Sequence, residues 1–272
     1  QVALILKYTF QFFALFSVLV CNSALGALWQ SGHGDIGIGF DGTDWDPHFH
    51  FHEEGDEHDH DDEEHKGEEH DDEDDHDDHE GEGDNHPIID GVEATEEEYE
   101  IDALTLLVSG GRLPGAGVAD SGAADIYVLA QDESLAVAQG TPWVGIAVEE
   151  IASGLLLNDL VTLSLVDVSG PGVFSLWTTD SFGADSVLMS SALGSDAADS
   201  VALPLEPGHY HFNMGFSEEG TYEVTFNSSA TTTGGVPTGT DFTVQFNVVP
   251  EPSSLFLLAL GAGAATLRRR RS

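Results

Sequence analysis

Residues 221–226 read Thr-Tyr-Glu-Val-Thr-Phe, a strict alternation of polar and apolar side chains. On an extended chain this order places Tyr222, Val224 and Phe226 on one face. The stretch 161–166 has the same period of two. Such alternation is typical of a β-strand with one face against a core. The two stretches therefore indicate β-sheets that are each buried on one side.

Similar segments occur along most of the chain, and turn-forming Gly, Pro and Ser residues separate them. Ile36 to Phe40 also alternates, with glycine between apolar residues. Short turns of helix are expected at 132–138 and 149–155. We expect strands at 100–108, 124–129, 143–148, 159–168, 172–178, 186–189, 209–216, 221–228 and 240–249. Strands at this spacing predict an all-β fold, an antiparallel β-sandwich of the immunoglobulin-like kind.

The charge of the chain is strongly one-sided. Among 272 residues there are 50 Asp and Glu but only 7 Lys and Arg, so the formal net charge is -43. Nucleic-acid binding needs a basic surface, and so does binding to anionic lipid headgroups. The sequence therefore excludes both classes of partner for the main part of the chain.

Most of the negative charge lies in one segment, residues 53–84. Its 32 residues comprise 21 Asp or Glu, six His, four Gly and one Lys, with no apolar side chain. Such a segment has nothing to bury and repels itself. We predict a disordered, extended insertion within a β-sandwich surface domain that spans residues 27–249.

The N-terminal end has the pattern of an export signal. Lys7 precedes a mostly apolar run at 10–20, and small residues follow at 23, 24, 26 and 27. We interpret residues 1–26 as a secretory signal peptide, with a retained membrane anchor as the alternative. The single cysteine, Cys21, falls inside this segment. The mature chain would then have no disulfide, thiolate metal site or cysteine nucleophile.

The C-terminal end has three parts. Val249, Pro250, Glu251 and Pro252 precede a 13-residue apolar stretch at 255–267, and four arginines follow, Arg268, Arg269, Arg270 and Arg271. As a helix the apolar stretch is about 20 Å long. A hydrocarbon core of about 30 Å is thicker than that. The stretch is therefore better suited to a temporary membrane attachment than to a permanent span.

This tail, residues 250–272 with Val249 before it, resembles the PEP-CTERM sorting signal of bacteria that make extracellular polysaccharide. The resemblance implies processing by an exosortase-type transpeptidase, with transient anchoring in the inner membrane through a short transmembrane helix. The mature protein would be secreted or retained at the cell surface or outer envelope. A plain C-terminal anchor is the alternative.

Histidines are concentrated around the acidic segment. His48, His50 and His52 alternate with phenylalanines, which places three imidazoles on one face of an extended chain. Six more stand among carboxylates: His58, His60, His65, His70, His76 and His79. Imidazole favours zinc and similar metals, whereas carboxylates alone favour calcium. We expect several weak zinc sites that lose metal below roughly pH 6.5. The alternative is a solvated polyanion without a metal role.

Three other histidines stand apart from the acidic segment. His209 and His211 are two residues apart and share one face of a predicted strand, and His33 lies near Asp35. We hypothesise a folded metal site from these three, together with Asp35 or His50. The alternative is histidines satisfied by backbone hydrogen bonds.

Several stretches between residues 29 and 249 also resemble the bacterial surface-anchored choice-of-anchor M domain. They are residues 31–38, 142–146, 169–174, 208–216 and 220–226. Relatives in actinobacteria sit beside metal-type ABC transporters. The combination with the tail is similar to a PEP-CTERM group repressed by the zinc uptake regulator. The resemblance implies a zinc site at His33, His209 and His211 and suggests a zinc ABC importer as a partner.

Enzyme motifs are weak. Gly-x-Ser-x-Gly and His-Glu-x-x-His are absent. Asp41, Asp44 and Asp46 are spaced partly like calcium ligands, but the twelve-residue EF-hand loop is missing. We therefore expect no enzyme but a surface protein that captures or buffers Zn²⁺. The main alternative is an acidic structural protein that binds Ca²⁺ in the exopolysaccharide matrix, and a metallohydrolase is a third.

Overall fold

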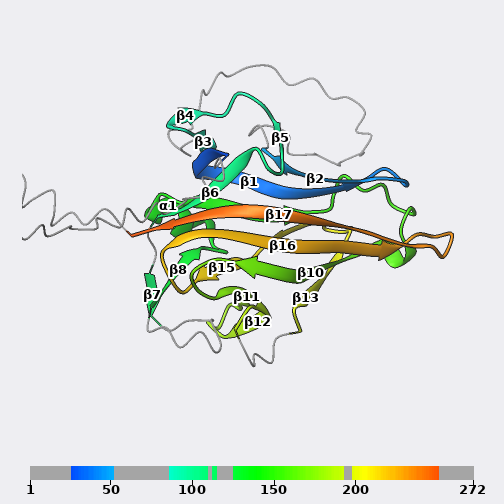
Figure 1. The fold of residues 1–272 in the computed structure, drawn as a ribbon. Helices are drawn as coiled ribbons and strands as arrows, with labels where there is room; N and C mark the ends of the chain where they lie inside the picture. Colours follow the sequence, from blue (N-terminus) through cyan, green and yellow to red (C-terminus); the bar gives the residue numbers. More distant parts are fainter. Residues whose placement is uncertain (1–25, 52–85, 110–111, 115–124, 193–197, 251–272) are drawn as a thin grey trace, which may run out of the picture.

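The computed structural model describes residues 26–51, 86–109, 112–114, 125–192 and 198–250. These residues form two β-sheets that face each other across a common core, so the predicted all-β sandwich is confirmed (Figure 1). Residues 1–25 of the predicted signal peptide, His52, the segment 53–84 and the tail from Glu251 lie outside the described residues.

The larger sheet has twelve strands, eight of them in the order β13-β10-β16-β17-β6-β1-β2-β5. Its strands are β1 (Ala27–Phe40), β2 (Trp45–His50), β3 (Ile88–Ile89), β4 (Val92–Glu93), β5 (Glu98–Glu100), β6 (Leu104–Ser109), β9 (Pro142–Ala147), β10 (Leu160–Ser169), β13 (Ser200–Pro204), β14 (His209–His211), β16 (Gly220–Thr231) and β17 (Pro237–Val249). The smaller sheet has the order β12-β11-β15-β8-β7. Its strands are β7 (Arg112–Pro114), β8 (Asp125–Leu129), β11 (Phe174–Thr179), β12 (Asp185–Ser190) and β15 (Asn213–Phe216).

Strand pairing is mixed, whereas the sequence predicted an antiparallel sandwich. Most pairs in the described residues are antiparallel, but β1 runs parallel to β6 and to β9, and β6 runs parallel to β17. Two of these parallel pairs involve the long strand β1. Its first part pairs with β6, and its second part pairs with β9 on one side and β2 on the other. Gly32 separates the two parts with a φ of 90°. A Cβ atom there would lie 2.3 Å from the His86 carbonyl oxygen, so the bend requires glycine.

The nine predicted strands are all present, with one notable difference, and the structure also contains strands that were not predicted, among them β2 and β13. The segment 209–216 is two strands, because β14 belongs to the larger sheet and β15 to the smaller one. The chain crosses between the sheets at Phe212, whose side chain is buried. The expected helix at 132–138 is α1 (Glu133–Gln139), which the Asp132 side chain caps.

The second expected helix, at 149–155, is wrong. The chain there forms turns, with the Ile151 N–H bonded to the Val148 carbonyl and Gly154 at a φ of 86°. Gly154 has the left-handed conformation that commonly ends an α-helix, and the turns before it do not build one. A short 3₁₀ helix, η1 (Leu157–Asp159), follows it.

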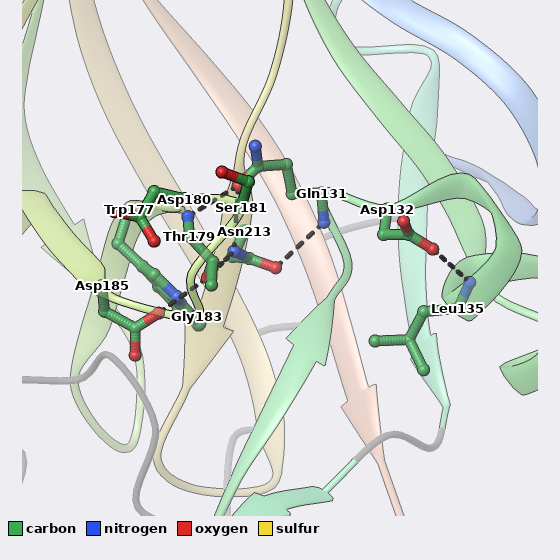
Figure 2. Close-up of a pocket in the computed structure, with 10 residues that line it drawn as sticks. All are labelled: Gln131, Asp132, Leu135, Trp177, Thr179, Asp180, Ser181, Gly183, Asp185 and Asn213. Carbon is green, nitrogen blue, oxygen red and sulfur yellow. Dashed lines mark hydrogen bonds between the residues drawn. The ribbon is translucent and has the colours of Figure 1, made fainter.

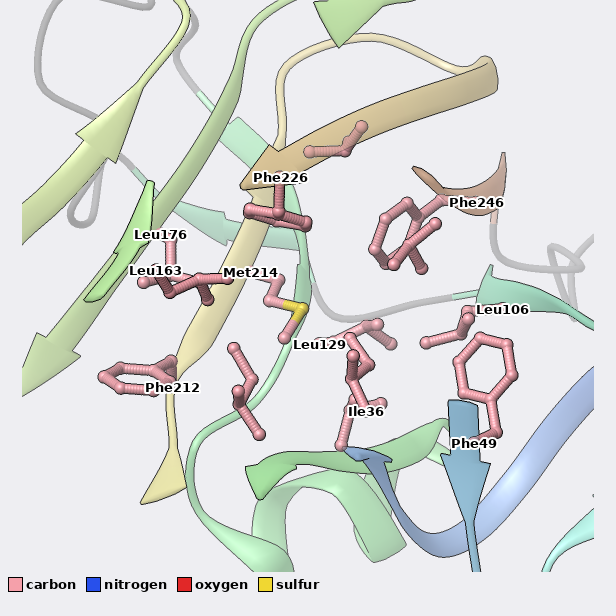
Figure 3. Packing of buried hydrophobic residues seen from close by; sticks show 14 of the residues in the cluster. Ile36, Phe49, Leu106, Leu129, Leu163, Leu176, Phe212, Met214, Phe226 and Phe246 are labelled. Atoms are coloured by element: carbon pink, nitrogen blue, oxygen red, sulfur yellow. The ribbon is translucent and has the colours of Figure 1, made fainter. Parts of the chain in front are cut away.

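The core lies between the two sheets (Figure 3). Leu129 and Met214 from the smaller sheet meet Leu106, Phe226 and Phe246 from the larger one, and all five are buried. This packing positions β9, β14 and the second half of β1 side by side, and the candidate site is built on those strands.

Candidate metal centre

Four potential metal ligands converge on the larger sheet: His33 and Asp35 from β1, and His209 and His211 from β14. One donor atom from each lies within 4.8 Å of all the others. The two residues from one strand are too few for a four-ligand site. Strand β9 brings the two pairs together because it pairs with β1 on one side and with β14 on the other. Residues more than 170 positions apart thus share one face, and we name these four residues the His₃Asp centre.

Asp35 is the middle of the centre. Its side chain is 0% exposed, and its Oδ1 lies 2.9 Å from His209 Nε2 and 3.8 Å from His33 Nε2. A buried carboxylate is stabilised by a positive partner such as an imidazolium or a metal cation. A tetrahedral zinc ion with bonds of about 2.0–2.1 Å holds its ligand atoms about 3.4 Å apart. The two observed distances from Asp35 lie on either side of that value.

Gly145 on β9 leaves the space in which the ligands meet. It is the register partner of both Asp35 and His211. A Cβ atom at this position would lie 2.0 Å from Asp35 Oδ1 and 2.6 Å from His209 Nε2. Any side chain here would therefore move two of the four ligands.

The third histidine, His211, is held neutral by its surroundings. Burial, together with the neighbouring His209 and His33, lowers the pKa of His211 to about 4. At neutral pH its ring nitrogens therefore keep a lone pair for a metal. Apart from a weak interaction with the Val144 backbone, neither nitrogen makes a hydrogen bond within the part of the chain that the structure describes.

Trp143 orients His211. The two rings are stacked with centroids 3.9 Å apart and an interplanar angle of 5°, and the centroid of His33 lies 4.4 Å from the same tryptophan. The indole Nε1–H donates to the Gln131 carbonyl oxygen at 3.0 Å, which fixes the ring. Supporting contacts of this kind hold metal ligands in a productive geometry.

Gln131 in turn lies in a cavity of about 550 Å³ beside the smaller sheet (Figure 2). Its N–H donates to Asn213 Oδ1 at 2.9 Å, and its Oε1 accepts the Thr179 N–H at 2.8 Å. Asn213 also donates to Thr179 Oγ1 at 3.1 Å. Because these polar groups bond one another, we read this end of the cavity as support for Trp143 rather than as a ligand site.

A second group of potential ligands consists of His48, His50 and Glu150, which we name the His₂Glu cluster. Glu150 Oε1 lies 3.1 Å from His48 Nε2 and 3.2 Å from His50 Nδ1. The hydrogen bond to Glu150 raises the pKa of His48 to about 9, and the bonds to both histidines lower the pKa of Glu150 to about 2. His48 therefore carries a proton at neutral pH, which a metal ion would displace.

The structure thus divides the candidate histidine ligands that it describes into two separate groups, which the sequence did not predict. It brings His33, His209 and His211 together with Asp35, and it places His50 in the neighbouring group with His48. Two residues were missed. Nothing in the local pattern distinguishes Glu150 from Glu149, and Gly145 has no ligand chemistry, so only the sheet register identifies either one.

The comparison with protein families identifies the end of the chain. Residues 248–271 match the PEP-CTERM protein-sorting motif. This motif marks the protein for export and for sorting to the cell surface through membrane anchoring, with an exosortase as the processing partner. No curated protein and no solved structure matches the chain.

Within the described ranges, which end at Pro250, no helix has the length and apolar character needed to cross a bilayer.

Proposed function

We propose that this exported, surface-sorted protein captures or buffers zinc outside the cytoplasm, with the His₃Asp centre as its tight site. The observation that carries the proposal is the convergence of three imidazoles on one buried carboxylate. Four protein ligands without cysteine form a closed tetrahedral set, and closed sets hold zinc rather than expose it for catalysis. A binding role therefore fits the centre better than a metallohydrolase.

The donor set separates zinc from calcium. Calcium takes six to eight oxygen ligands, whereas the centre offers three nitrogens and a carboxylate. The alternative proposal, an acidic calcium-binding protein of the exopolysaccharide matrix, rests on the 21 carboxylates of residues 53–84. The six histidines of that segment favour zinc, and we propose that it gathers ions for the centre.

The resemblance of residues 29–249 to the choice-of-anchor M domain supports a metal-related role at the cell surface. On this proposal the protein belongs with the PEP-CTERM group that the zinc uptake regulator represses, and a zinc ABC importer receives the captured ion. Exopolysaccharide is the partner that the alternative function requires.

Zinc titration of the protein by calorimetry, at pH 7.5 and with excess calcium, tests the central claim. We expect one tight zinc ion in the wild-type chain and its loss in the combined variant His33→Ala, His209→Ala, His211→Ala. The reason is that no neutral imidazole would remain beside Asp35. Equal tight binding by both proteins would refute the centre, and no zinc heat above the calcium background would favour the matrix alternative.

Deletion of residues 53–84 tests the acidic segment separately. We expect the number of weakly bound zinc ions to fall, while the tight ion and the cooperative unfolding transition are kept. The segment holds no apolar side chain that a core could lose. Circular dichroism and calorimetry would check this, and an unfolded deletion variant would show that the segment is part of the fold.

A further inference from the structure

The His₂Glu cluster and the His₃Asp centre lie on the same face of the larger sheet. Strands β2, β1, β9 and β14 are neighbours there, and register partners share a face. Two adjacent rows cross the four strands: His50, Asp35, Gly145 and His211 in one, and His48, Gly37, Ala147 and His209 in the other. In both rows the histidines stand on the outer strands, and the inner positions hold only Asp35 and small residues.

Small inner residues leave room for imidazoles to lean inward. A Cβ atom on Gly37 would lie 2.7 Å from His48 Nε2, just as one on Gly145 would collide with the ligands of the His₃Asp centre. Gly37 and Gly145 thus each leave a space on this face of the sheet, which the side chains of potential ligands occupy. Each of them lies beneath a separate group of potential ligands.

Glu150 completes the group over Gly37. It is the third residue after β9 ends, and its carboxylate reaches back to both histidines of β2. The distances of 3.1 and 3.2 Å from Glu150 Oε1 to the two ring nitrogens are close to the ligand separation of a tetrahedral zinc ion, about 3.4 Å.

The two groups share no ligand, and their spacing along the sheet favours two separate ions. Gly37 and Gly145 are diagonal neighbours on adjacent parallel strands. Two residues along a strand cover about 6.6 Å and neighbouring strands lie about 4.8 Å apart, so such positions are about 8 Å apart. Metal ions that share bridging ligands are only about 3.5–4 Å apart. The two groups would therefore hold one ion each.

We propose that His48, His50 and Glu150 form a second zinc site, which exchanges its ion faster than the His₃Asp centre. The proposal rests on the proposed function and extends it. Three protein ligands leave a fourth position open to water or to an incoming ligand, whereas the centre supplies all four. Glu150 is also 35% exposed, while Asp35 is fully buried. The open site takes up and releases zinc beside a site that retains it.

Zinc binding and release by the full chain test the proposal, with Zn²⁺ as the probe and a chromophoric chelator as the acceptor. We expect the wild type to release zinc in two phases, with the fast phase at least tenfold faster than release from the His₃Asp centre. Glu150→Gln and Gly37→Ala should each bind one zinc ion fewer than the wild type and should lack the fast phase. Asp167→Asn is the matched control, because it removes one exposed carboxylate on β10. It should bind and release zinc as the wild type does.

The outcomes separate this proposal from the proposed function. If Glu150→Gln and Gly37→Ala bind and release zinc like the wild type, the His₂Glu cluster is an ion pair only and the proposal is overturned. His211→Ala reports on the centre instead, since it should remove the slow phase and leave the fast one. If Gly37→Ala does not fold, Glu150→Gln decides alone, because it keeps the size of the side chain.

Discussion

Gly145→Ala is expected to weaken tight zinc binding at least about 100-fold, which corresponds to about 2.8 kcal/mol, while the protein stays folded. The added methyl group would lie 2.0 Å from Asp35 Oδ1 and 2.6 Å from His209 Nε2, so both ligands must move. These atoms are the ends of side chains rather than backbone, and therefore the sheet itself need not shift. Calorimetric zinc titration and circular dichroism would measure the two effects.

Gly234→Ala is the control for this substitution. Its Cβ atom would make one ordinary contact, 3.7 Å from Thr232 Oγ1, and no ligand of either group is near it. We expect unchanged zinc affinity. Tight binding by Gly145→Ala equal to that of the control would contradict the placement of the metal over Gly145.

Phe216→Ala is expected to destabilise the folded chain by about 3–5 kcal/mol, the largest effect on stability among the predictions. Phe216 lies on the smaller sheet and is fully buried. Its ring centroid is 4.9 Å from those of Tyr222 and Phe246 on the larger sheet and 5.4 Å from that of Phe174. Truncation would leave a cavity where the two sheets meet. Chemical denaturation followed by tryptophan fluorescence would measure the loss.

The matched control is Phe182→Ala in the turn between β11 and β12. Phe182 is 95% exposed, so its truncation should change the free energy of unfolding by less than about 0.5 kcal/mol. If Phe216→Ala lowers the free energy of unfolding as little as Phe182→Ala does, the aromatic contacts between the sheets contribute little to stability.

Local pattern was sufficient for the nine predicted strands, because alternation of side chains directly reports which face is buried, whereas β2 and β13 were not predicted. Tyr222, Val224 and Phe226 were placed on one face from their spacing, and all three are buried on β16. The division of residues 209–216 into β14 and β15 was not predictable in this way, since both strands alternate in the same manner. The parallel pairs of β1 also depend on segments more than 70 residues away.

In the candidate site, too, local spacing predicted one part and the tertiary structure decided the rest. His209 and His211 were predicted to share a face because they are two residues apart in an extended segment, and they do. Their meeting with His33 and Asp35 was a hypothesis from residue type and resemblance. It requires β9 between β1 and β14, in one register, with glycine at position 145.

The sequence by itself determined the β-rich character of the chain, its acidic charge and its C-terminal sorting motif, because each depends on residues that are contiguous or simply counted. Only the tertiary structure decided which histidines share a group and that Glu150 joins His48 and His50. Ligand groups depend on distances between strands far apart in the chain. Those distances follow from sheet register and core packing, which no local pattern of side chains records.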